Sequence, residues 1–219
     1  FHDQGAENET LVQMLRLNVR IPDTLMGDLN AQVAACKVGD RRLRELADRF
    51  GAETLMGIFE TLLDRSEAMT RSAIATIPDG TYGYHDFLDN DGVDLDDPIR
   101  IEVAVTVSGE TVHVDFTGSN PQVRGPFNCM PSGSQAAAYF AVRAMTDPQI
   151  PTNGGCFRPV SLHLPTASVV NPREPAPVNS RTSTIKRITG CILGALRQAV
   201  PEKSSADAGG EMVLLAFGG

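Results

Sequence analysis

Residues 99–116 carry the pattern that most restricts how this chain can fold, because apolar and polar side chains alternate there almost without a break. A period of two places successive side chains on opposite faces of a β-strand. Ser108-Gly109, near the middle, is a two-residue turn of the kind that joins antiparallel strands. The pattern therefore predicts a β-hairpin over 99–116, with one face formed by Ile99, Ile101, Val103, Val105, Val107, Val112, Val114 and Phe116.

The predicted turn also determines which residues lie opposite each other. On the apolar face it pairs Val105 with Val112, Val103 with Val114, and Ile101 with Phe116. On the other face it places Glu102 across from Asp115, with His113 beside them. Two carboxylates directly opposite each other on neighbouring strands repel unless a positive group lies between them. Arg100 can supply that charge as an ordinary surface ion pair, or His113, Asp115 and Glu102 can bind a divalent metal, for which they are weak candidates.

Two long helices are predicted before the hairpin, over about 25–50 and 53–77, because apolar residues recur there at steps of three and four. Gly51 separates them, so the pair is predicted to form an αα-hairpin. A shorter helix precedes them, with Asn8 as its N-cap and its end near Arg20. Cys36 falls on the apolar face of the first long helix and is expected to be a small core residue.

A second stripe on the first long helix consists of polar or very small residues. Asp28, Gln32, Ala35 and Gly39 share this face. Small side chains allow close packing against a neighbouring element. The alternative is a polar wall of a site or a subunit contact, for which Asp28 and Gln32 are the candidates.

The remaining segments complete an α+β fold. A strand is predicted at 81–89, short strands at 160–164 and 168–170, and helices at about 134–145 and 183–200. The Asp-rich stretch 89–97 is expected to be a solvated turn, because Pro98 stands where an EF-hand needs glutamate. We therefore predict a helical region over 1–78 and a mixed region over 79–219, with the long helical hairpin packed on a mixed, mainly antiparallel sheet with additional helices.

Two polar loops, residues 117–131 and 148–159, are the candidate binding elements. They are rich in glycine, proline and asparagine and lie between strongly patterned strands and helices. Asparagine side chains donate and accept hydrogen bonds, and glycine lets backbone N–H groups approach a ligand. The substrate-pocket candidates are Asn128, Asn153, Arg158 and Gln122, with Asp115 orienting the loop after the hairpin. The same residue types also form turns, which is the alternative for each of them.

Composition excludes several function classes. The net charge of −8 argues against nucleic acid or an anionic membrane as the main partner, since both require clustered lysine and arginine. No apolar run approaches the roughly 18 residues of a membrane span. The 4 cysteines form no C-x-x-C pair, and no secretory signal opens the chain, which favours the cytoplasm. The first residue is not Met and the apolar run Met212–Phe217 is cut off, so we expect a piece of a longer protein.

Five segments together resemble the hydantoinase B/oxoprolinase family. They are NVRIPDTLMGDLNAQVAACKVGDRRLRELADRFG, DGTYGYHDFLDNDG, VDFTGSNPQVRGPFN, IPTNGGCFRPV and NPREPAPVNSRTSTIKRI, and they span nearly the whole chain in order. The resemblance implies a subunit that works with a hydantoinase A-type, ATP-binding partner to open cyclic amides such as hydantoins or 5-oxoproline. It also implies ATP and a divalent metal in the full complex, with the metal ligands in an earlier part of the subunit and none in this chain. The family-like positions are Asp28, Gln32, Asp115, Gln122, Asn128, Asn153 and Arg158.

Three functions follow from the resemblance as hypotheses. The first is part of an ATP-dependent cyclic-amide hydrolase, which this piece alone would not perform. The second is part of an ATP-dependent acetone or acetophenone carboxylase, because similar sequences occur in those enzymes. The third is a mainly structural or subunit-docking segment, in which the polar loops serve an interface rather than a substrate.

Overall fold

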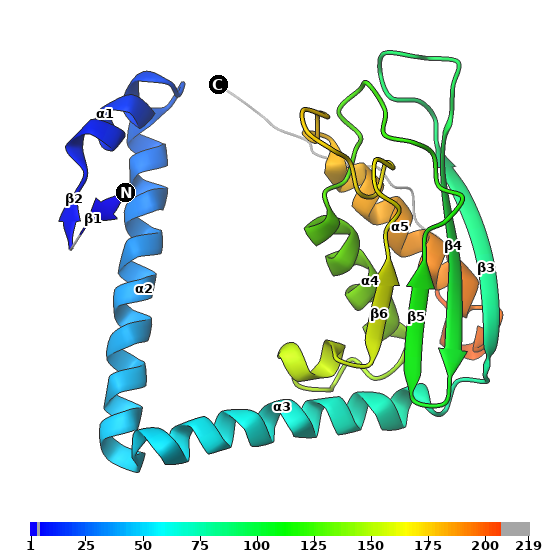
Figure 1. Ribbon diagram of the computed structural model, residues 1–219, viewed down its shortest axis with the longest axis horizontal. Helices are drawn as coiled ribbons and strands as arrows, with labels where there is room; N and C mark the ends of the chain where they lie inside the picture. The colour runs from blue at the N-terminus through cyan, green and yellow to red at the C-terminus, as the bar shows by residue number, and fades with distance from the viewer. Residues whose placement is uncertain (4, 207–219) are drawn as a thin grey trace. The chain divides into compact units, whose positions relative to one another are not determined.

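The computed structural model describes residues 1–3 and 5–206 (Figure 1). Contacts between residues divide the chain into two compact units, Phe1–Glu60 and Thr61–Gly219. Helix α3 (Ala52–Ile74) runs across the division, so its last turns belong to the second unit. None of the helices in the described part of the chain is both long and apolar enough to cross a membrane.

The first unit consists mainly of helices. Strands β1 (His2–Asp3) and β2 (Ala6–Glu7) form a small antiparallel pair before helix α1 (Glu9–Leu17). The predicted N-cap is confirmed, because the Asn8 side chain accepts a hydrogen bond from the backbone N–H of Leu11 at 3.0 Å. Helix α2 (Pro22–Phe50) follows, with proline in its first turn, and ends at Gly51, where φ is 85°.

The predicted core position of Cys36 is wrong. Helix α2 packs on α1, and Met26 in its second turn is its buried residue. Cys36 lies further along the helix and its side chain is exposed. Periodic spacing predicts an apolar face but does not show which turns of that face have a neighbour within the described unit, and Leu43 and Phe50 of the same face are exposed as well.

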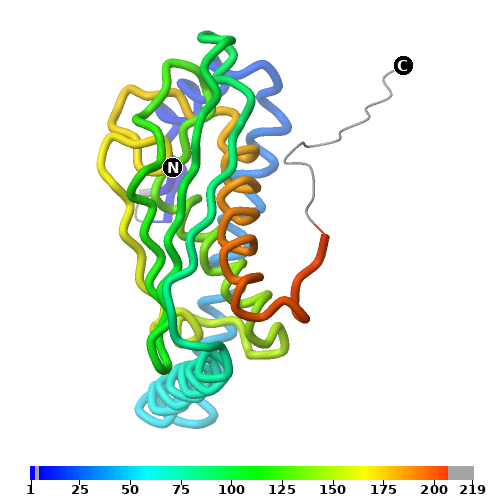
Figure 2. Tube along the Cα trace, turned by 90° about the vertical axis from the view of Figure 1, so that its right-hand side faces the viewer, coloured from blue at the N-terminus to red at the C-terminus, as the bar shows by residue number. Residues whose placement is uncertain are grey.

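The second unit is built on a four-stranded sheet. Its order is β3 (Gly80–Leu88), β4 (Ile99–Ser108), β5 (Thr111–Asp115) and β6 (Val160–His163), in which the first two pairings are antiparallel and the last is parallel. Helix α5 (Arg181–Leu196) packs on β3 and β4, and α4 (Pro131–Met145) packs on α5 (Figures 1 and 2). Two short 3-10 helices, η1 (Gly154–Phe157) and η2 (Pro201–Lys203), follow α4 and α5 respectively.

The core of this unit lies between the sheet and the two helices. The apolar face predicted for the hairpin is buried, and every one of its eight residues has at most 2% of its surface exposed. Burying a side chain of that size stabilises the fold by about 1.5–3 kcal/mol. Ile74, at the end of α3, is also fully buried in this core. The α+β class and the mixed, mainly antiparallel sheet are confirmed, while the packing of the whole helical hairpin on the sheet stays a prediction.

The predicted register of the hairpin is wrong by two residues. The turn is Gly109-Glu110, so Ser108 lies opposite Thr111 and Val107 opposite Val112. Gly109 has φ of 56°, which suits the first central position of a type II′ turn. A shift of two positions keeps every side chain on its own face, so alternation alone cannot distinguish the two registers.

The correct register also separates the two carboxylates. Asp115 lies opposite Ala104, not opposite Glu102 as predicted. The Glu102 side chain pairs instead with Arg100, at 2.9 Å between Oε2 and Nη2. The surface ion pair with Arg100 is therefore the arrangement that the structure contains.

Candidate functional site

The first polar loop, residues 117–131, is organised by the buried side chain of Asn128. Its Oδ1 accepts a hydrogen bond from the backbone N–H of Val123 at 2.8 Å. Its Nδ2 donates to the carbonyl oxygens of Val123, Gly125 and Pro177, at 2.9, 3.2 and 3.0 Å. A buried amide with all of its polar atoms paired fixes the backbone around it. Asn128 therefore joins this loop to residues 171–180, the proline-rich connection before α5.

Gln122 makes a second link to the same connection. Its Oε1 accepts a hydrogen bond from the backbone N–H of Arg173 at 2.7 Å, and its Nε2 donates to the Arg173 carbonyl at 3.4 Å. The backbone N–H of Gln122 donates to the carbonyl of Ala167 at 2.9 Å. Gln122 thus holds the first polar loop through its side chain, which bonds to Arg173, and through its backbone, which bonds to Ala167.

The loop is also joined to the Asp-rich turn, through a residue that the sequence interpretation missed. Asp91 was expected in a solvated turn, but 3% of its surface is exposed. Its carboxylate accepts hydrogen bonds from the backbone N–H groups of Val93, Asp94 and Gly125, each at 2.7 Å. Donation from Asp94, together with that from Val93 and Gly125 and the charge of Arg124, lowers the pKa of Asp91 against the opposing effect of burial. An added Cβ on Gly125 would lie 1.7 Å from the Asp91 carbonyl oxygen, so glycine is required there.

Asp115 holds the start of the same loop. Its Oδ1 accepts hydrogen bonds from the backbone N–H and the hydroxyl of Thr117, at 2.8 and 2.7 Å. Burial acts to raise the pKa of Asp115, but the two Thr117 donors and the nearby imidazoles of His163 and His113 hold it below its usual value. His113 itself contacts the Ser161 hydroxyl through Nδ1, at 2.9 Å.

The predicted metal candidates are not brought together. Glu102 pairs with Arg100, while His113 and Asp115 lie on β5 against β6. Among residues 1–3 and 5–206 no three His, Cys, Asp or Glu side chains are arranged to hold a metal ion.

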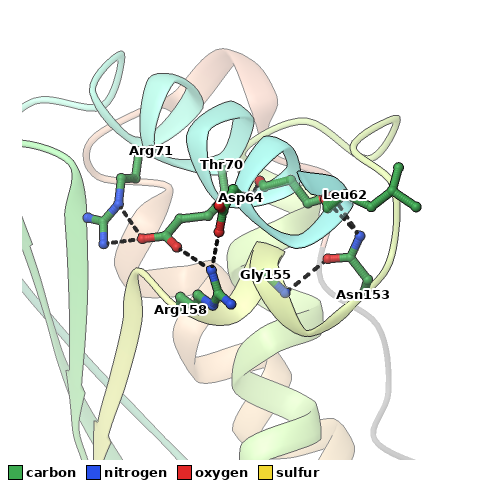
Figure 3. Close-up of polar contacts among 9 residues, drawn as sticks. Leu62, Asp64, Thr70, Arg71, Asn153, Gly155 and Arg158 are labelled. Atoms are coloured by element: carbon green, nitrogen blue, oxygen red, sulfur yellow. Dashed lines mark hydrogen bonds and ion pairs between the residues drawn. The ribbon is translucent and has the colours of Figure 1, made fainter. Parts of the chain in front are cut away.

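The second polar loop, residues 148–159, contacts the last turns of α3 (Figure 3). Asn153 caps η1 through its Oδ1, which accepts from the Gly155 N–H at 2.9 Å. Its Nδ2 donates to the Ser66 hydroxyl at 2.8 Å and to the Leu62 carbonyl at 3.4 Å. An added Cβ on Gly155 would lie 1.9 Å from the carbonyl oxygen of Leu63. The glycine therefore allows η1 to touch the helix backbone.

Arg158 adds ion pairs to the contact between the second polar loop and α3 (Figure 3). Its Nη1 lies 2.8 Å from the Asp64 carboxylate and 3.0 Å from that of Glu67. Glu67 also pairs with Arg71 at 2.7 Å. The hydrogen bonds from Arg71 and Arg158 lower the pKa of Glu67, and those to Asp64 and Glu67 raise the pKa of Arg158. Asn153 and Arg158 thus both fasten the second polar loop to α3.

Neither loop lines the groove between α4, α5 and β3. This groove has a volume of about 530 Å³, and it contains none of the predicted site residues. A smaller, more polar hollow of about 280 Å³ lies at the start of α5, lined by Phe127, Ser183 and Arg187 among others. Asp28 and Gln32 are exposed on α2 in the first unit. The role of the five predicted residues at a substrate pocket stays a prediction, and so does the role of Asp28 and Gln32 as a polar face of α2.

Comparison with known proteins identifies the family. The sequence model described as hydantoinase B/oxoprolinase matches residues 1–219, the whole chain. The chain belongs to the hydantoinase B/oxoprolinase family. Among its relatives, a protein named as the B subunit of a D-/L-hydantoinase from Pseudomonas sp. strain NS671 is 36% identical over all of this chain and 38% of its own length. The beta subunit of the caprolactamase of Pseudomonas jessenii is 33% identical over 94% of this chain and 36% of its own length.

Two solved structures share the fold of this chain. The crystal structure of the ATP-dependent caprolactamase from Pseudomonas jessenii superposes with a TM-score of 0.84 and 33% identity over 91% of this chain and 34% of that chain. A nucleotide-free acetone carboxylase structure has a TM-score of 0.82 at 15% identity, over 92% of this chain and 28% of that one, which shows the fold alone. The chain spans well under half of the length of these relatives.

The sequence did not reveal several residues whose partners are far away along the chain. Arg187 of α5 pairs with Asp86 of β3, and the Thr184 hydroxyl donates to the Phe127 carbonyl. Arg143 of α4 donates to the Pro148 carbonyl at 2.8 Å and so closes the start of the second polar loop. Of the missed residues, Asp91 alone had a local signal, because aspartate often bonds the N–H groups two and three positions ahead.

Proposed function

We propose that this chain is part of the B-type subunit of an ATP-dependent hydrolase that opens cyclic amides such as hydantoins or 5-oxoproline and acts with an A-type, ATP-binding subunit. The observation that carries the proposal is the similarity to the beta subunit of the caprolactamase, at 33% identity over 94% of this chain. The family match over residues 1–219 supports the same function. The 4 cysteines all lie in the described residues and none forms a disulfide, which suits a cytoplasmic enzyme.

The reaction needs activation because an amide carbonyl is a poor electrophile. ATP would supply that activation by transferring its terminal phosphoryl group to the carbonyl oxygen, with release of ADP. Water would then add to the carbon, the C–N bond would break as the nitrogen takes up a proton, and a second water would release inorganic phosphate from the resulting carboxyl phosphate. The residues described do not fit a divalent metal, since no suitable set of three ligands is present among them. By family resemblance, we propose that ATP and a divalent metal bind elsewhere in the full complex.

Within that enzyme, the two polar loops are proposed to act as structural clamps. Every polar atom of the Asn128 side chain is used within the chain, and so is the Asn153 amide. A group already paired with the protein must break those contacts before it can bind a substrate, and each broken contact costs free energy. This observation favours the structural alternative for these residues over direct substrate binding.

A carboxylase of the acetone or acetophenone type is the second candidate for the whole enzyme. The acetone carboxylase structure has nearly the same fold similarity as the caprolactamase structure. Its sequence identity is 15%, compared with 33% for the caprolactamase. A fold shared at low identity does not carry a reaction with it, so we place the hydrolase first.

The deciding experiment uses the full-length subunit assembled with its A-type partner. Hydantoin, 5-oxoproline, caprolactam, and acetophenone with bicarbonate are each supplied with ATP and Mg²⁺, and ADP release and product formation are measured together. We expect ADP release to rise with at least one cyclic amide in proportion to ring opening, and the B-type subunit alone to be inactive. ADP release stimulated only by the ketone with bicarbonate would reject the hydrolase and select the carboxylase.

A further inference from the structure

The second half of α2 is exposed although it carries large apolar side chains. Every residue from 34 to 46 is exposed. Val38, Leu43 and Leu46 keep 46%, 50% and 40% of their surface exposed, and Phe50 keeps 47%. In proteins most of the stability of a helix comes from packing an apolar face, not from helix propensity. This half of α2 therefore needs a partner surface.

The apolar positions of α2 have the spacing of a coiled-coil seam. They are separated alternately by three and four residues, and one place in the series is taken by Asp40. The apolar members are Met26, Leu29, Val33, Cys36, Leu43, Ala47 and Phe50. A seam with this period stays on one side when two helices wrap around each other, and a single polar residue in it fixes their register. The pattern thus indicates that the partner surface is another long helix.

The charges of α2 are complementary to those of a second α2. Residues 22–36 carry Asp23 and Asp28 and no basic side chain, whereas residues 37–50 carry five basic and three acidic ones. The two halves therefore have net charges of −2 and +2. Two antiparallel copies place the acidic half of each helix beside the basic half of the other, and two-fold symmetry makes both contacts the same. A different partner would require no such match between the halves of one helix.

We propose that two copies of this chain associate through antiparallel α2 helices. Cys36, the middle residue of α2, then lies next to the two-fold axis. The second half of each α2 lies beside the first half of the other, on which the α1 of that copy packs. Met14 and Leu17 of α1 keep 59% and 83% of their surface exposed, so the association also has apolar surface to cover on α1.

Thiol crosslinking of the full-length subunit tests the proposal. Cys36 is exposed, and the other cysteines of this chain are buried. We expect a short bismaleimide to join two subunits covalently, and Cys36→Ser to abolish the product. Phe50→Cys, added to Cys36→Ser, should give at least tenfold less product than native Cys36, because antiparallel helices hold the two copies of position 50 about 40 Å apart. Equal crosslinking through positions 36 and 50 would show a parallel pair and contradict the proposal.

Sedimentation of the same subunit gives an independent result. We expect a dimer whose Kd rises at least tenfold with Leu43→Asp, a change within the seam, and stays the same with Glu45→Ala, which lies on the opposite side of the helix. Far-ultraviolet circular dichroism confirms that both variants fold. A monomeric subunit would overturn the proposal, and so would a Cys36 that the reagent cannot reach, since the rest of the subunit would then cover α2. Neither measurement uses a substrate, so the outcome does not depend on the proposed reaction.

Discussion

At the scale of single residues, the first polar loop and the Asp-rich turn are held together by polar side chains that each form hydrogen bonds with several backbone groups. Asn128 makes four hydrogen bonds, and Asp91 accepts three from the backbone. A buried backbone group without a partner costs about 1–3 kcal/mol. Removing one such side chain would therefore affect several segments at once.

The Asp91 carboxylate gives stability that depends on pH. Its pKa is lowered in the folded protein, so its contribution is complete above the unfolded pKa of about 3.9 and is lost as the pH falls through the folded value. We expect Asp91→Asn to lower the urea midpoint of the full-length subunit at pH 7. The difference from the native protein should shrink below about pH 4.

The control for this prediction is another acid of the same turn. Asp96→Asn changes an exposed side chain and should leave the urea midpoint unchanged at both pH values. A difference between Asp91→Asn and the native protein that stays constant down to pH 3 would contradict the assignment of the carboxylate as the stabilising form.

The roles of these residues show where sequence reasoning stops at this scale. Asn128 could be chosen as a structural or binding residue because asparagine, glycine and proline surround it. It donates to the carbonyl of Pro177, which lies 49 positions further along the chain, and no local pattern encodes this contact. The same holds for Arg158, whose acidic partners on α3 lie more than 90 positions earlier.

At the scale of elements, the second polar loop and α3 touch through backbone. The nearest atom to an added Cβ on Gly155 is the Leu63 carbonyl oxygen at 1.9 Å, whereas on Gly154 it is Leu63 Cδ2 at 3.7 Å. The two neighbouring glycines therefore form a matched pair for comparison. Gly155 is required for the contact with α3, whereas Gly154 is not.

We expect Gly155→Ala to lower the free energy of unfolding by at least about 2 kcal/mol, because η1 must move away from α3 and the Asn153 and Arg158 contacts must lengthen. Gly154→Ala should change it by less than about 0.5 kcal/mol. Denaturant unfolding of both variants, with hydrogen exchange of residues 61–74, measures the effect. Equal stability of the two variants would show that the loop does not rest on the helix.

The hairpin shows how far alternation determines an element. It identified both strands and every buried residue of the apolar face, because the side-chain period of two is a local property. It did not identify the turn, because Ser108-Gly109 and Gly109-Glu110 give the same faces and differ only in which residues are opposite. The structure places the positive φ of Gly109 at the first central position of the turn, which alternation does not encode.

At the scale of the whole molecule, this chain corresponds to part of the length of its relatives. It covers between 34% and 38% of the length of the caprolactamase and hydantoinase relatives, and it contains no metal-binding cluster in its described residues. The fold class and the family could be predicted from the sequence, because alternation, helix spacing and family-like segments are present within it. The partners of the polar loops could not, because they lie far away in the chain.

The measurement that tests our account of those loops most directly is the turnover of the assembled enzyme carrying Asn153→Ala, compared with its thermal midpoint. If the side chain only clamps η1 to α3, the midpoint should fall while kcat and KM of the folded enzyme stay within about threefold of the native values. A fall in kcat of about a hundredfold or more at an unchanged midpoint would place Asn153 at the reacting substrate and contradict the account.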